Sequence, residues 1–149
     1  MNIREVKEGG AQEVSTDDFF KGKKVALFAV PGAFTSTCSV KHLPSFTNNA
    51  DALKKKGVDV IAGIAVNDAS VMKAWGEANG ASGKVTMLSD GNGDLARALG
   101  VEADMTKHGM GRRSRRYSML VDNGVVKQLN LEEPGAFGVS SGDHLLTQI

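Results

Sequence analysis

Runs of consecutive apolar residues alternate along this chain with segments in which apolar residues recur every three to four positions. Continuous runs are typical of strands buried on both faces, and the spaced pattern is typical of helices with one apolar face. The runs predict strands at 25–30, 58–66 and 84–88. Helical spacing is carried by Val40, Leu43, Phe46, Ala50 and Leu53, then by Val71, Ala74, Trp75 and Ala78, and last by Leu95, Ala98 and Leu99. Alternating strands and helices favour a parallel sheet in this part of the chain.

The second half of the chain has a different pattern. Two apolar runs, 116–121 and 125–131, flank Asp122-Asn123-Gly124, and Asn-Gly between such runs is a strong hairpin signal. Ser140 and Asp143 form a capping pair that predicts a last helix over the apolar residues up to Ile149. A further small hairpin, through Gly9-Gly10, is expected between positions 6 and 14.

Taken in order, these elements predict an α/β fold with a central mixed sheet and helices on both faces. Parallel strands followed by an antiparallel hairpin and a closing helix fit a thioredoxin-like arrangement. The length of 149 residues suits one domain over 1–149, and a hydrophobic content of 41% supplies a core.

Charge and targeting signals narrow the classes of function. The chain has 18 basic and 17 acidic residues, a balance that argues against a nucleic-acid partner. No stretch approaches the roughly 18 apolar residues of a membrane span. The N-terminus lacks the apolar run of a signal peptide. We therefore expect a cytoplasmic protein with no membrane partner.

The basic residues cluster at one place, where Arg112, Arg113, Arg115 and Arg116 occupy neighbouring positions. Such a run is usually a solvated face. The alternative is that one of these arginines binds an anion or a substrate.

Cys38 is the one cysteine of the chain, so neither an intramolecular disulfide nor a cysteine-based zinc site can form. A lone cysteine is usually a small core residue. Cys38, however, lies between a predicted buried strand, closed by Pro31-Gly32, and the start of a helical pattern. Sites form in the loops after the carboxyl ends of strands, and the first turn of a helix stabilises a thiolate. Cys38 is therefore a candidate nucleophile.

Several neighbours of Cys38 carry chemistry of their own. One of the hydroxyls of Thr35, Ser36 and Thr37 either caps the helix or hydrogen-bonds the thiolate and a substrate oxygen. Pro44 is expected to kink the helix, which would let the Cys38 turn unwind after oxidation.

His42 raises the alternative of a Cys/His hydrolase. The two residues are only four positions apart on one predicted helix, whereas such enzymes usually bring the pair from separate parts of the fold. We therefore expect His42 to support or pack against the site.

The segment PGAFTSTCS, followed by HLPSF, closely resembles the active-site segment of the peroxiredoxins, and of the peroxiredoxin-5 or plant type II group in particular. Pro31, Thr35 and Cys38 match the family pattern at the right spacing. The likeness continues through 66–76, 113–124 and 129–137, so it spans nearly the whole chain.

The resemblance implies a thiol peroxidase that reduces hydrogen peroxide and organic hydroperoxides without a metal or organic cofactor. Cys38 matches the cysteine that attacks peroxide and becomes a sulfenic acid. Thr35 matches the threonine that contacts thiolate and peroxide, and Arg116 matches the active-site arginine, which should point at Cys38. The residues expected around the bound substrate are Pro31, Gly32, Thr37 and His42. Met110, Phe34 and Phe46 are candidates for setting the pocket width.

The chain departs from the family pattern at two places. Ser36 stands where the motif commonly has proline, and Gly63 stands where many relatives carry a further cysteine. With no resolving cysteine, the sulfenic acid would be reduced by an external thiol. We expect glutathione, with or without glutaredoxin, ahead of thioredoxin.

Family likeness further implies a homodimer packed through loops near the site. Two other functions stay open for the sequence: a peroxide sensor that passes oxidation to a protein partner, and a chaperone-like or purely structural role.

Overall fold

The computed structural model describes residues 1–149. Its strands are β1 (Asn2–Lys7), β2 (Gly10–Ser15), β3 (Lys24–Ala29), β4 (Val60–Ala65), β5 (Thr86–Ser89), β6 (Glu102–Asp104), β7 (Arg112–Ser114), β8 (Tyr117–Asp122) and β9 (Val125–Leu131). Its α-helices are α1 (Thr16–Phe20), α2 (Leu43–Thr47), α3 (Ala50–Lys55), α4 (Ala69–Ala78), α5 (Asp94–Ala98) and α6 (Gly142–Gln148). Two short helical segments complete the set: the π-helical η1 (Cys38–His42) and the 3₁₀ turn η2 (Thr106–His108).

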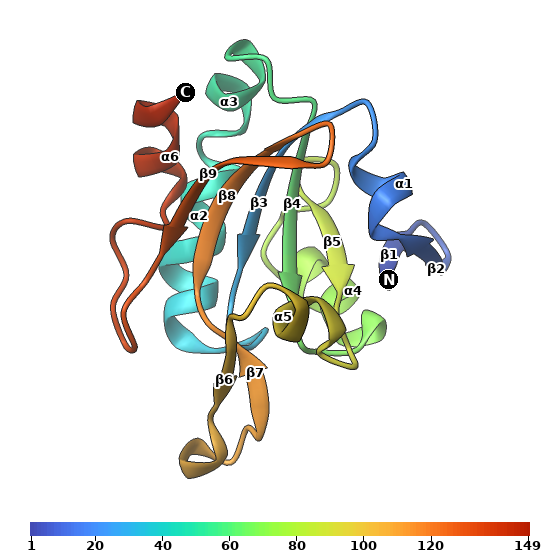
Figure 1. The fold of residues 1–149 in the computed structure, drawn as a ribbon, viewed down its shortest axis with the longest axis vertical. Coiled ribbons are helices and arrows are strands. Elements are labelled where there is room, and N and C mark those ends of the chain that lie inside the picture. Colours follow the sequence, from blue (N-terminus) through green and yellow to red (C-terminus); the bar gives the residue numbers. More distant parts are fainter.

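Seven strands form one sheet in the order β2-β1-β5-β4-β3-β8-β9 (Figure 1). Strands β3, β4 and β5 pair in parallel, whereas β1, β2, β8 and β9 pair antiparallel with their neighbours. Strands β6 and β7 form a separate ribbon, which projects from the body of the molecule in Figure 1. The predicted mixed sheet is confirmed, and so are its three buried strands and the β8–β9 hairpin.

Helices cover both faces of the sheet, as the sequence predicts, because the central strands bury side chains on both sides. On one face, Phe28 of β3 belongs to a core shared with α2, α3, α4 and α6. On the other face, Leu27 belongs to a second core shared with α1 and α5. Leu27 and Phe28 lie in different cores because successive side chains of a strand point to opposite faces of the sheet.

Of the two predicted hairpin turns, the second is formed as expected and the first lies one residue earlier in the sequence. At the β8–β9 turn, Asn123 (φ 50°) and Gly124 (φ 82°) both take left-handed conformations, as a type I′ turn requires. In the first hairpin, Lys7 pairs with Gly10, so the loop is Glu8-Gly9 and not Gly9-Gly10.

The helix after Cys38 departs from the predicted apolar face. Val40 is 71% exposed, whereas Leu43 and Phe46 are buried. The cause is the π turn, in which the Leu43 N–H donates to the Cys38 carbonyl five residues back. A π turn adds a residue and so rotates the positions within it relative to the rest of the helix. Pro44 follows directly and has no N–H to donate, which favours this irregularity.

The next helices also bury faces other than those predicted. In α4 the buried residues are Met72, Trp75 and Gly76, and Ala74 and Ala78 are exposed. The reason is close approach to β5, since a Cβ on Gly76 would lie 3.0 Å from Cγ of Met87. In α5 the buried residues are Leu95 and Ala96, whereas Ala98 and Leu99 are exposed.

The cap of α6 is Ser141, whose hydroxyl accepts the His144 N–H, and not Ser140 as predicted. Ser140 is instead fully buried and hydrogen-bonded elsewhere. None of the helices has the length and apolar character needed to cross a membrane.

Candidate active site

The loop between β3 and η1 is held in a fixed shape by polar contacts from neighbouring elements. The Ala33 N–H donates to Oδ1 of Asn67, which follows β4 (2.9 Å). Phe34 has φ 64°, an uncommon conformation for a residue with a side chain. The Thr35 hydroxyl donates to the Gly32 carbonyl (2.8 Å). This folding places Cys38 in the first helical turn after the loop.

Cys38 has no exposed surface and meets a guanidinium group. Nη2 of Arg116 donates to Sγ of Cys38 across 3.1 Å, although the two residues are 78 positions apart. Arg116 directly precedes β8, the antiparallel neighbour of β3, so the sheet brings both residues to the same edge. A guanidinium is always charged and can stabilise a neighbouring thiolate.

His42 is buried beside this pair and uses both ring nitrogens. Nη1 of Arg116 donates to Nδ1 of His42 (2.8 Å), so the proton of the neutral ring is on Nε2, which donates to the Ser140 carbonyl (3.0 Å). Burial and, after it, the charge of Arg116 lower the pKa of His42 from 6.5 to about 3. His42 is thus neutral, with no nitrogen free to deprotonate Cys38 or to bind a peroxide. This arrangement gives no support to a Cys/His hydrolase, and a contact of His42 with substrate stays a prediction.

The loop after β9 completes the site, and the sequence alone did not single out its key residue. Glu132 is buried, and its Oε2 accepts hydrogen bonds from the Gly138 N–H (2.6 Å), the Ser140 N–H (2.8 Å) and the Ser140 hydroxyl (2.7 Å). Burial acts to raise the pKa of Glu132, but these hydrogen bonds outweigh it and hold the pKa below its usual range. Phe137 packs on the site from this loop, with its ring centroid 5.2 Å from that of His42.

The three hydroxyls before Cys38 do not cap the helix. Thr35 makes no hydrogen bond to Cys38, because its proton is donated to Gly32. Its lone pairs therefore remain available to accept a hydrogen bond. Ser36 is exposed and Thr37 is half-buried, and neither side chain makes a hydrogen bond within the protein.

The four clustered arginines have separate surroundings. Arg112 is exposed and forms an ion pair with Glu102. Nε of Arg113 donates to the Met110 carbonyl, and Nη2 of Arg115 donates to the Glu132 carbonyl. The interpretation of the run as a solvated face therefore holds for Arg112 alone.

Of the residues expected to shape the pocket, some lie at the loop before Cys38 and one lies in the core. Met110 closes over Gly32, since a Cβ on that glycine would lie 2.8 Å from Cε of Met110. Pro31 is half-buried at the start of the same loop, and Phe34 is 56% exposed. Phe46 is fully buried and stacks on Phe28, so it belongs to the core and lines no open pocket.

Gly63 has a packing role of its own. A Cβ at this position would lie 2.7 Å from Cζ of Phe28. A cysteine here would therefore need a displacement of the Phe28 ring.

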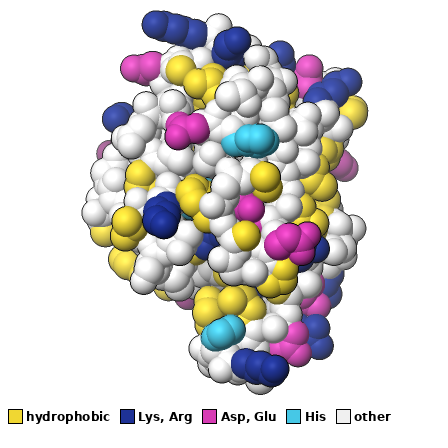
Figure 2. Space-filling view, turned by 90° about the vertical axis from the view of Figure 1, so that its left-hand side faces the viewer, with side chains coloured by type: hydrophobic (Ala, Val, Ile, Leu, Met, Phe, Trp, Pro, Cys, Tyr) yellow, Lys and Arg dark blue, Asp and Glu magenta, His cyan; other side chains and the backbone are white.

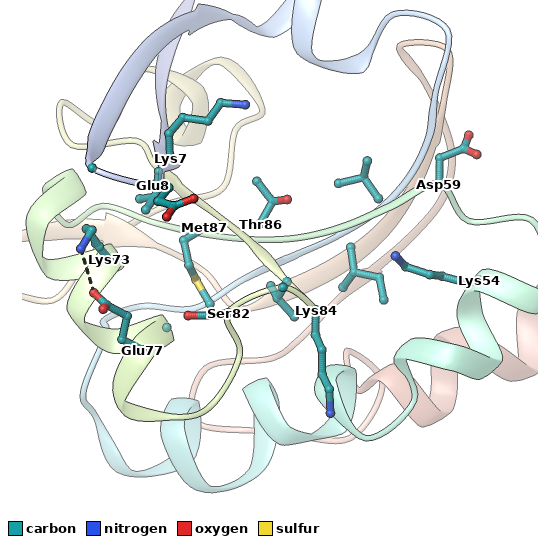
Figure 3. Close-up of a pocket in the computed structure, with 17 residues that line it drawn as sticks. Lys7, Glu8, Lys54, Asp59, Lys73, Glu77, Ser82, Lys84, Thr86 and Met87 are labelled. Atoms are coloured by element: carbon teal, nitrogen blue, oxygen red, sulfur yellow. Dashed lines mark hydrogen bonds and ion pairs between the residues drawn. The ribbon is translucent and has the colours of Figure 1, made fainter.

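A cavity of about 520 Å³ lies away from this site (Figure 3). It opens at the amino ends of β4 and β5 and is lined by lysines that include Lys54 and Lys84. Lys73 in its wall forms an ion pair with Glu77. Cys38 takes no part in this cavity, so its volume is not that of the thiol site.

Fold and site together define a thioredoxin-like α/β protein with one buried cysteine facing a guanidinium. A family model described as Redoxin matches residues 2–146. The chain is 48% identical over 139 residues to Peroxiredoxin-2C of Oryza sativa subsp. japonica, covering 93% of this chain and 86% of that relative. It therefore belongs to the peroxiredoxin family, and the resemblance stated from the motifs is confirmed.

Two further comparisons place it within the family. The chain is 54% identical over 140 residues to the chloroplastic Peroxiredoxin-2E of Arabidopsis thaliana, covering 93% of this chain. It spans only 60% of the length of that relative and 63% of a similar chloroplastic protein of rice. The crystal structure of reduced Prx3 in complex with H₂O₂ from Vibrio vulnificus superposes with a TM-score of 0.94 at 49% identity, covering 99% of this chain and 92% of that one.

Proposed function

We propose that this protein is a thiol peroxidase that reduces hydrogen peroxide and organic hydroperoxides at Cys38. The observation that carries the proposal is the 3.1 Å contact between the Arg116 guanidinium and Sγ of Cys38. A buried thiol would be inert as a small apolar group, whereas a guanidinium in contact favours the reactive thiolate. The names of the relatives and their likeness over most of the chain support the same activity.

The reaction needs only groups that the site contains. The Cys38 thiolate attacks one peroxide oxygen in line with the O–O bond, an S–O bond forms, and hydroxide or alkoxide leaves and takes up a proton. Cys38 becomes a sulfenic acid. Arg116 stabilises the charge that develops along the O–O bond. Because the Thr35 hydroxyl donates to Gly32, it would accept a hydrogen bond from the protonated peroxide oxygen.

Access to the thiol requires a movement, since Cys38 has no exposed surface. Met110 closes over Gly32, and we expect it to move when the substrate enters. Pro31, Gly32 and Thr37 would then border the bound peroxide.

An external thiol would complete the cycle, because the chain has one cysteine. A glutathione thiolate attacks the sulfenic sulfur, an S–S bond forms as the S–O bond breaks, and the leaving hydroxide takes up a proton to become water, giving a mixed disulfide. A second thiol, from glutathione or glutaredoxin, then releases Cys38. Peroxide consumption measured with glutathione and glutaredoxin should exceed that measured with thioredoxin and its reductase. Efficient turnover with the thioredoxin system alone would contradict the glutathione preference, and one equivalent consumed per chain with every reductant would favour the peroxide sensor.

The assembly and location are also proposals. Phe34, Val40 and Val139 expose apolar surface on the segments that build the site, and Figure 2 shows hydrophobic side chains scattered over the face that it draws. A homodimer packed through these segments would cover such surface. A monomer mass at micromolar concentration by analytical ultracentrifugation would contradict it. A cytoplasmic location is the expectation from sequence, and cell fractionation tests it.

A further inference from the structure

Glu132 presents a buried carboxylate that makes no ion pair. Burying a charge costs free energy unless hydrogen bonds replace the lost water. Three donors meet this need, and all three converge on the single oxygen Oε2. Two of them come from Ser140, so the carboxylate fixes the position of that residue.

Ser140 is the first member of a continuous chain of contacts that ends at the reactive sulfur. Its carbonyl accepts the hydrogen bond from Nε2 of His42 (3.0 Å). Nδ1 of His42 accepts from Nη1 of Arg116 (2.8 Å), and Nη2 of the same guanidinium donates to Cys38 (3.1 Å). Each member is hydrogen-bonded to the preceding one.

The main chain and the side chain of Glu132 act on Arg116 separately. The Glu132 N–H donates to the Arg116 carbonyl (3.0 Å), which positions the backbone of the arginine. The carboxylate reaches the guanidinium only through Ser140 and His42. Arg116 forms no ion pair of its own. A neutral imidazole thus orients the guanidinium while its charge remains directed to the sulfur.

We propose that Glu132 is a positioning residue for the peroxide reaction: its carboxylate holds Ser140, Ser140 orients His42, and His42 orients Arg116 toward Cys38. The inference rests on the proposed peroxidase function and assigns a role to a residue that does not itself touch the reacting atoms. Its prediction is that the hydrogen bonds of Glu132, and not its charge, determine the reactivity of Cys38.

The test uses the reduced full-length protein and two substitutions of Glu132. Glu132→Gln keeps an uncharged oxygen that can accept hydrogen bonds from Ser140, whereas Glu132→Ala removes the acceptor. The rate constant of Cys38 with hydrogen peroxide should fall about 10- to 100-fold in E132A, as expected for a displaced catalytic group, and should stay close to the wild-type value in E132Q. The nuclear magnetic resonance signal of the His42 Nε2–H reports its hydrogen bond to the Ser140 carbonyl, and it should shift in E132A and persist in E132Q. Glu133→Ala, at the exposed neighbouring position, is the matched control and should behave as wild type.

Four outcomes separate the possibilities. Folded E132A with a wild-type rate and an unshifted His42 Nε2–H signal overturns the inference, and so does an equal loss of rate in E132Q and E132A. If E132A does not fold, Glu132→Asp takes its place, because it keeps the charge on a stem too short to hold Ser140, and an unchanged rate in E132D then overturns the inference. Failure of the wild type itself to react with peroxide would instead contradict the proposed function.

Discussion

Replacing Arg116 with methionine is expected to slow the reaction of Cys38 with hydrogen peroxide about 100- to 1000-fold, the range found when one preorganised donor to a developing charge is removed. Methionine keeps much of the volume of the side chain and removes the charge. The substitution takes away both the contact at 3.1 Å to the sulfur and the donor that faces His42. Stopped-flow measurement of a single reaction of the reduced protein gives the rate constant without any contribution from the reductant.

Arg112→Met is the matched control for this experiment. Its side chain is 67% exposed and forms an ion pair with Glu102, away from Cys38, so the substitution should leave the rate constant unchanged. A loss of similar size in both variants would assign the effect to the general charge of the arginine cluster. A wild-type rate in Arg116→Met would remove Arg116 from the mechanism.

Acidification from pH 7 to pH 5 should lower the free energy of unfolding by about 2 kcal/mol through His42 alone. The pKa of His42 is lowered from 6.5 to about 3 in the native protein, chiefly by burial and then by Arg116. The unfolded chain therefore takes up a proton as the pH falls below about 6.5, whereas the native protein does not. The contribution of the neutral His42 to the free energy of unfolding is complete above pH 6.5 and is lost progressively as the pH falls toward 3.

Urea unfolding at a series of pH values measures this loss. Glu132, the carboxylate nearest to His42 along the hydrogen-bonded chain, has its pKa held below the usual range and so adds to the loss only at lower pH. His42→Asn should show a shallower dependence on pH between 7 and 5, and His108→Asn, at an exposed position, should keep the wild-type dependence. Equal stability of the wild type at pH 7 and pH 5 would contradict a neutral His42 in the folded state.

The sheet could be predicted from the sequence because strands buried on both faces need uninterrupted apolar runs, as at 25–30 and 58–66. The helix faces could not be predicted to the same degree. The π turn rotates Val40 to the surface, and the approach of Gly76 to Met87 selects the buried side of α4. Both depend on tertiary packing, which periodicity along one helix does not record.

Some residues of the site could likewise be predicted from the sequence, and others could not. The contact between Cys38 and Arg116 could be predicted because both residues lie in motifs that resemble a known family. Glu132 could not, because its hydrogen bonds to the loop after β9 exist only in the folded chain, and an acidic residue after a strand is typical of a surface. Ser140 and Ser141 are equally suited to cap a helix, and the buried Glu132 decides between them.

The most direct test of the peroxidase assignment is the consumption of hydrogen peroxide by wild type and by Cys38→Ser, each supplied with glutathione and glutaredoxin and, separately, with thioredoxin and its reductase. The wild type is expected to consume many equivalents per chain with at least one of these systems, and Cys38→Ser is expected to consume none. Full activity of Cys38→Ser, or no activity of the wild type with either reductant, would contradict the assignment.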